Sequence, residues 1–108
     1  MNRYQSEQEI ENLVRRFEKC ETGADDFKHA EHIVVAVWYL HTMDRDGALD
    51  RMRSGLLRFL NHYEGDTSKY SEAITVFYID KIVEKLNELG PVSLVEKCNT
   101  VLAADFRG

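Results

Sequence analysis

Proline and cysteine are scarce in this sequence, and it contains no long apolar run. Of its 108 residues, one is a proline, Pro91, and two are cysteines, Cys20 and Cys98. Two cysteines permit one disulfide by count, but the start of the chain has no apolar export signal, so we expect a protein of the reducing cytoplasm. No segment reaches the roughly 18–20 consecutive apolar residues of a membrane span. We therefore expect no membrane partner.

Basic residues are also outnumbered. The chain has 14 lysines and arginines against 19 aspartates and glutamates, which gives a formal net charge of −5. Non-specific binding to nucleic acid depends on lysines and arginines that neutralise phosphates, so we expect no nucleic-acid partner. The hydrophobic fraction of 44% and the charged fraction of 31% are typical of a globular chain. The length indicates a single domain over residues 1–108.

Strand patterns are absent, whereas apolar residues recur at helical spacing. The spacing predicts five helices: one from the capping box at Ser6 to Gly23, one over 27–43, one that carries Leu49 to Tyr63, one over 69–89, and a short one from Pro91 to about Ala104. Short loops favour antiparallel neighbours. We therefore expect an all-α, single-domain antiparallel bundle of four main helices plus a short C-terminal helix.

The second of these helices, over 27–43, is the most apolar, and the predicted arrangement of the other helices is built around it. A helix that is apolar on nearly every side is surrounded by other elements, so we expect it to be central, with Asp25 or Asp26 as its cap. The third helix contains Gly55, and a glycine inside a helix costs about 1 kcal/mol relative to alanine. Either Gly55 permits another helix to approach closely, which we favour, or it is merely tolerated.

Two histidines and one carboxylate form the candidate site. His29 and His32 share a face in the first turns of the central helix, and Glu72 lies on the apolar stripe at the start of the fourth helix. If these two helices run parallel, the three side chains lie at the same end and can converge. Two imidazoles and a carboxylate suit a divalent metal such as zinc, iron or nickel. Open coordination positions would then bind water or substrate.

Other interpretations of these residues remain open. His29 and His32 can be polar residues of a helix start that bond to Asp25 or Asp26. Glu72 gains about 0.3–1 kcal/mol from the helix dipole alone and can mark the edge of the core. We expect His41 to be a hydrogen-bonded core residue and His62 to be solvated.

Several catalytic signatures are absent. The sequence has no Glu-x-x-His, no His-Glu-x-x-His, no Cys-x-x-Cys, no phosphate-binding glycine loop and no Gly-x-Ser-x-Gly. Cys20 and Cys98 would act as nucleophiles only beside a base, and no motif supplies one. The sequence therefore assigns no catalytic residue and no reaction, and it leaves open whether the protein is an enzyme.

The residues around the candidate site carry a resemblance. The segments are Phe27-x-His29-x-x-His32-x-x-x-Ala36-x-x-Tyr39-Leu40, then Ala48-Leu49 and Gly55-Leu56-x-x-Phe59, then Tyr70-x-Glu72-x-Ile74-Thr75. They resemble a family of small, uncharacterised bacterial helical proteins with Phe-x-His-x-Asp/Glu-His-x-x-x-Ala-x-x-Tyr-Leu and Tyr-His-Glu-Thr-Ile-Thr motifs. The resemblance implies that the regions of His29, His32 and Glu72 belong to one site, and it implies no reaction. Ser71 stands where the family has histidine, so a ligand supplied by that histidine would be missing here.

Three functions follow from these observations. The first is a helical bundle that binds a divalent metal through His29, His32 and Glu72. The second is a non-enzymatic interaction or self-association module, a homo-oligomer for example, that uses Leu57 and Trp38. The third is a metal-free pocket for a small molecule, lined by Tyr39, Tyr70 and the histidines.

Overall fold

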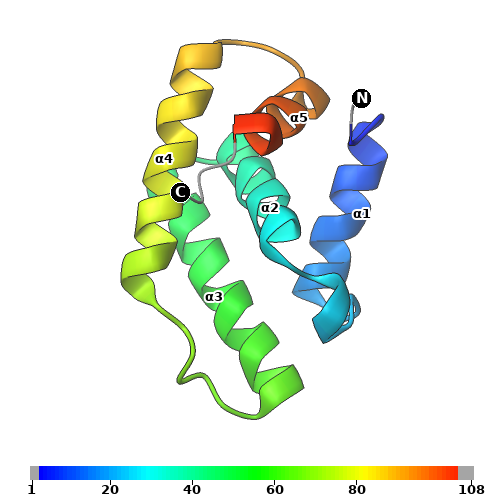
Figure 1. The fold of residues 1–108 in the computed structure, drawn as a ribbon, viewed down its shortest axis with the longest axis vertical. Coiled ribbons are helices and arrows are strands. Elements are labelled where there is room, and N and C mark those ends of the chain that lie inside the picture. The colour runs from blue at the N-terminus through cyan, green and yellow to red at the C-terminus, as the bar shows by residue number, and fades with distance from the viewer. Residues whose placement is uncertain (1–2, 105–108) are drawn as a thin grey trace.

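Five α-helices and one short 3₁₀ helix make up the structure of residues 3–104, which a computed structural model describes (Figure 1). Their bounds are α1 Glu7–Glu18, the 3₁₀ helix Ala24–Asp26, α2 His29–Thr42, α3 Arg45–Glu64, α4 Glu72–Leu89 and α5 Leu94–Ala104. No strand occurs over these residues. The all-helical prediction is therefore confirmed.

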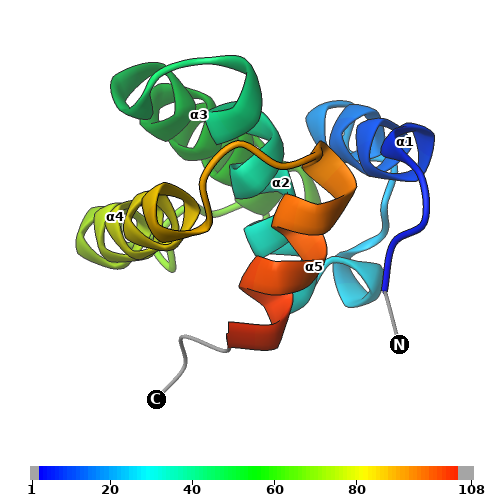
Figure 2. The same cartoon turned by 90° about the horizontal axis from the view of Figure 1, so that it is seen from above.

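The helix α2 is the central element. It contacts α1, α3, α4 and α5, and five consecutive residues, from Ile33 to Val37, are buried. Figures 1 and 2 show α5 lying across α2, while α1 and α4 lie on opposite sides of it. The predicted central position of this apolar helix is confirmed, because only contacts on several sides bury consecutive residues of a helix.

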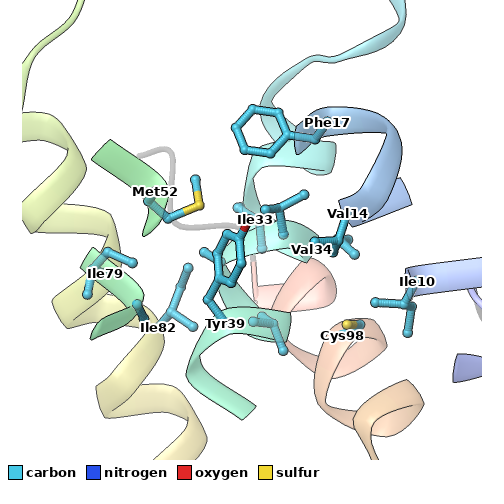
Figure 3. Close-up of a cluster of buried hydrophobic side chains, with 14 of the residues drawn as sticks. Ile10, Val14, Phe17, Ile33, Val34, Tyr39, Met52, Ile79, Ile82 and Cys98 are labelled. Carbon is cyan, nitrogen blue, oxygen red and sulfur yellow. The ribbon is translucent and has the colours of Figure 1, made fainter. Parts of the chain in front are cut away.

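The core has two regions on either side of α2. On one side, Ile10 and Val14 of α1 lie close to Cys98 of α5 (Figure 3). On the other side, Met52 of α3 and Ile79 of α4 face the remaining surface of α2. The second region borders the candidate site.

Gly55 permits the close approach that its position predicts. Phe17 of α1 is fully buried, and its ring stacks on Phe27 at a centroid distance of 4.6 Å. A Cβ atom added to Gly55 would overlap the same Phe17 ring and would lie 2.7 Å from its Cζ atom. The missing side chain is therefore what brings α3 against α1.

Serine caps set the starts of three helices. The predicted capping box of α1 is present: the Glu9 amide donates to Ser6 Oγ at 3.3 Å, and the Ser6 amide donates to Glu9 Oε1 at 3.1 Å. The start predicted for α4 at Lys69 and the start predicted for α5 at Pro91 are both too early. Ser71 caps α4 and Ser93 caps α5, through bonds of 3.2 and 3.1 Å from the third residue of each helix. A serine hydroxyl that accepts a hydrogen bond from an otherwise unpaired amide of the first turn fixes the start of the helix at that residue.

The start of α2 differs from the prediction in a similar way. Neither Asp25 nor Asp26 caps it, since both lie in the 3₁₀ helix. The helix begins instead after Lys28, whose amide donates to the Glu31 carboxylate at 2.9 Å. The predicted end of α1 at Gly23 is also wrong, because the helix ends at Glu18 with Lys19 as its C-cap.

Among residues 3–104, no helix has both the length and the apolar character that a membrane crossing requires.

Candidate functional site

An apolar pocket of about 150 Å³ lies between α2, α3 and α4. The residues that line it are His29, His32, Ile33 and Ala36 of α2, Met52 and Leu56 of α3, and Ile74, Thr75, Tyr78, Ile79 and Ile82 of α4. Among residues 3–104, no lysine, arginine, aspartate or glutamate lines the pocket. The polar groups that these residues give to the lining are two imidazoles, one threonine hydroxyl and one phenol.

Helical periodicity brings these side chains onto facing surfaces. On α2, His29, His32 and Ala36 are separated by three and four residues and so share one face. On α4, Ile74, Tyr78 and Ile82 recur every four residues. Figure 3 shows Met52, Ile79 and Ile82 on the side of α2 away from Cys98. The pocket is the space that these faces leave between them.

Ring contacts hold both imidazoles. The His29 ring meets the Tyr78 ring edge-on, with centroids 5.2 Å apart and an interplanar angle of 68°. The His32 ring meets the Phe27 ring in a similar arrangement, at 4.7 Å and 63°. Because T-shaped contacts are a favoured geometry for aromatic rings, the two histidines have defined orientations at the pocket wall.

Burial keeps His32 neutral. Burial and, to a smaller extent, the neighbouring charge of His29 lower the pKa of the His32 imidazole to about 4, while Glu31 opposes the shift. At neutral pH the imidazole therefore has one nitrogen that donates and one that accepts. No hydrogen bond contributes to this shift of the His32 pKa.

Glu72 is bound elsewhere and does not line the pocket. The Arg53 guanidinium donates to both of its carboxylate oxygens, at 2.9 and 2.5 Å, and the Tyr70 hydroxyl donates at 2.7 Å. The hydrogen bond from Arg53 is the main reason that the pKa of Glu72 falls to about 2. Over the described residues, no three histidine, cysteine, aspartate or glutamate side chains form a group that can hold a metal ion.

The other two histidines lie at the surface. His41 is exposed, and its Nδ1 atom lies 3.1 Å from Nζ of Lys97. The prediction that His41 is a core residue is wrong, because its side chain lies on the exposed face of the last turn of α2. His62 is exposed, as predicted, and its ring packs against Tyr63.

The tyrosines of the site differ from those that the sequence suggested. Neither Tyr39 nor Tyr70 lines the pocket. The Tyr39 hydroxyl donates to Glu18 Oε2 of α1 at 2.6 Å, which directs it away from α4. Tyr78 and Met52 do line the pocket and were missed. The four-residue spacing of Ile74, Tyr78 and Ile82 is a pattern that identifies Tyr78 as part of an apolar stripe.

Comparison with known proteins gives no further guide. No family model, no curated protein and no solved structure matches the chain. The site is therefore interpreted from its own geometry.

Two large apolar side chains of α4 are exposed, and one of them, Ile74, lines the pocket. Ile74 is 59% exposed and Phe77 is 49% exposed, and both lie in the first half of α4. Leu57 and Trp38, the contacts expected for an interaction module, are half-buried instead. Among residues 3–104, the exposed large apolar side chains therefore both lie on α4.

Proposed function

We propose that this protein binds a small apolar molecule, about the size of one benzene ring, in the pocket between α2, α3 and α4. The observation that supports the proposal is the pocket itself: about 150 Å³ of space with an apolar lining and two imidazoles at one wall. Ligand sites are typically apolar concavities with a few placed polar groups. An enclosed apolar cavity of about this volume in another protein binds benzene, whereas this pocket is partly open to solvent.

The expected affinity is modest. A dissociation constant of about 1 mM corresponds to about 4 kcal/mol of binding free energy. For the six heavy atoms of benzene this is about 0.7 kcal/mol per atom, which is below the ceiling of about 1.5 kcal/mol for very small ligands. Millimolar benzene therefore suffices as a probe of the pocket.

The test compares benzene binding by two variants that add the same side chain at different places. Ala36 is buried and lines the pocket, so Ala36→Leu fills the space. Ala103 is exposed on α5, so Ala103→Leu is the matched control. In saturation-transfer NMR and calorimetry, the wild type and Ala103→Leu bind benzene and Ala36→Leu does not.

Two results contradict the proposal. One is no binding of benzene by the wild type at its solubility limit. The other is equal binding by a folded Ala36→Leu. If Ala36→Leu does not fold, Ile79→Ala replaces it: this change enlarges the pocket, so the variant binds naphthalene more tightly than the wild type does.

A divalent-metal site formed by His29, His32 and Glu72 is the second candidate, favoured by the two neighbouring imidazoles at one wall. As described, Glu72 is held by Arg53 and does not complete the set. Metal binding by all three residues therefore requires the Glu72 carboxylate to break its ion pair with Arg53. Zinc, iron or nickel that binds untagged protein and is lost in both His32→Ala and Glu72→Gln supports this candidate. No bound metal and no thermal shift would rule it out.

Self-association is the third candidate, and the exposed Ile74 and Phe77 side chains favour it. Two copies that share this surface would bury both side chains. Light scattering then gives a dimer for the wild type and a monomer for Phe77→Lys. A monomer for both, at all accessible concentrations, contradicts self-association.

The remaining expectations from sequence belong to this proposal as well. We expect a cytoplasmic bacterial protein that binds neither nucleic acid nor membrane, in keeping with its net charge of −5. The antiparallel order of the four longer helices and the resemblance to the bacterial helical family also remain predictions.

A further inference from the structure

The wall that carries the histidines is the part of the pocket that can select a ligand. Of the other polar groups in the lining, the Thr75 hydroxyl donates to the carbonyl of Ser71 at 2.9 Å. His32 also lines the pocket, with its ring against Phe27, and no hydrogen bond contributes to its pKa shift. The His32 imidazole is therefore one of the groups, beside His29 and Tyr78, that a polar atom on a bound ligand can meet.

The charge of the described lining favours a neutral ligand. Among residues 3–104, no lysine or arginine lines the pocket, and Arg53, on α3, is occupied by Glu72 and Asp50. An anion or a cation that enters the pocket would lose part of its hydration without gaining a charged partner from these residues, which is costly. We therefore take the ligand to be a neutral molecule.

The remaining lining favours a flat aromatic body. The Tyr78 ring and the edge of the His29 ring offer aromatic contacts, and the Met52 thioether is a favourable neighbour for an aromatic ring. The volume of about 150 Å³ matches a single ring. One hydroxyl on that ring would satisfy one nitrogen of His32 and would add little volume.

We propose that the ligand class of this pocket is a small phenol, with its ring between α2, α3 and α4 and its hydroxyl hydrogen-bonded to the His32 imidazole. This inference rests on the proposed function, since it names the ligand of the same pocket. A phenol is neutral below a pH of about 10, whereas benzoate, which is slightly larger, is an anion and finds no cationic partner in the lining that residues 3–104 form.

Three single-ring probes test the inference in calorimetric titrations at pH 8, where an ordinary histidine is neutral. Phenol binds the wild type about 10-fold more tightly than benzene, as one net hydrogen bond of about 1.4 kcal/mol predicts. Sodium benzoate does not bind. The His32→Phe variant keeps a ring and removes the nitrogens, so phenol loses its 10-fold advantage while benzene binds as before. His62→Phe, at the surface, is the matched control and changes neither affinity.

Each contrary outcome has its own meaning. Equal affinities for phenol and benzene, tighter binding of benzoate, or an unchanged phenol affinity in His32→Phe overturns the phenol inference and leaves the apolar pocket intact. Failure of all three probes to bind the wild type overturns the proposed function as well. If His32→Phe does not fold, as judged from its thermal unfolding, the shift of the His32 side-chain nitrogens in the wild type decides: phenol moves them and benzene does not.

Discussion

The imidazole of His29 packs edge-on against the ring of Tyr78, with centroids 5.2 Å apart. This contact joins α2 to α4 at the wall of the apolar pocket. The two helices are far apart in sequence, and the ion pair that lies nearest to the start of α4, between Arg53 and Glu72, joins α4 to α3 instead. The ring contact therefore contributes to the position of α4 relative to α2, on which the shape of the pocket depends.

The His29–Tyr78 contact has a measurable energy. An aromatic pair contributes about 0.5–1.5 kcal/mol beyond its buried area. In a double-mutant cycle with His29→Leu and Tyr78→Leu, we expect a coupling of this size in the free energy of urea unfolding. A coupling of zero would mean that the two rings are merely neighbours.

Alanine at Gly55 should destabilise the protein, although alanine is the better helix former. Its Cβ atom would overlap the Phe17 ring, and overpacking of this kind costs about 1–3 kcal/mol. Ser54→Ala, one residue earlier and exposed, is the control and should change stability by less than about 0.5 kcal/mol. A Gly55→Ala variant as stable as Ser54→Ala would show that α1 and α3 are not so close.

The burial of His32 should make folding sensitive to acid. In the unfolded chain the imidazole titrates near its ordinary pKa, whereas burial lowers the folded pKa to about 4. The unfolded state therefore binds more protons between these values, so the contribution of neutral His32 is complete above the ordinary pKa and is lost as the pH falls toward 4. At about 1.4 kcal/mol per pKa unit, the loss is about 3 kcal/mol.

Denaturant titrations of the wild type and His32→Phe from pH 8 to pH 4 measure this loss. The wild type should lose about 3 kcal/mol more than the variant over that range, because all other titrating groups are common to both. Parallel stability profiles would contradict the assignment of a buried, neutral His32.

The two cysteines should differ in reactivity. Burial raises the pKa of the Cys98 thiol to about 12, and its side chain is fully buried between α5 and α1, whereas Cys20 is partly exposed. Because the thiolate is the reactive form, a chromogenic disulfide reagent should titrate one thiol rapidly in the native protein and two after unfolding. Cys20→Ser should abolish the rapid phase. Rapid modification of Cys98 would show that α5 opens readily.

Much of the fold was accessible from sequence because it depends on local patterns. The apolar run from Ile33 to Val37 indicates a helix that is covered on several sides, and the Ser6 capping box marks the start of α1. The sequence places the starts of α4 and α5 too early, because the apolar periodicity continues on the N-terminal side of the true starts at Glu72 and Leu94. Each true start is set by a serine hydroxyl that accepts a hydrogen bond from a backbone amide of the first turn. The close approach of α1 to α3 could also be predicted, because a glycine inside a helix, here Gly55, leaves room for a neighbouring side chain.

The site was harder to predict from the sequence, because it depends on which face of each helix packs against which neighbouring helix. The spacing of His29 and His32 correctly places both on one face, and both line the pocket. The position of Glu72 was ambiguous, since a carboxylate in a first helical turn serves an ion pair equally well, and Arg53 lies 19 residues away in the sequence. Nothing in the local pattern indicates that Met52 would face Ile79 across the same space.

The most direct test of an apolar pocket is to see where benzene sits. Intermolecular NOEs between benzene and the methyl groups of a uniformly labelled sample locate it. Our account predicts saturable NOEs to the methyl groups of Met52, Ile33 and Ile79, and none to Ile10 on the far side of α2. NOEs confined to exposed methyl groups such as Ile74, or none at all at saturating benzene, would contradict it.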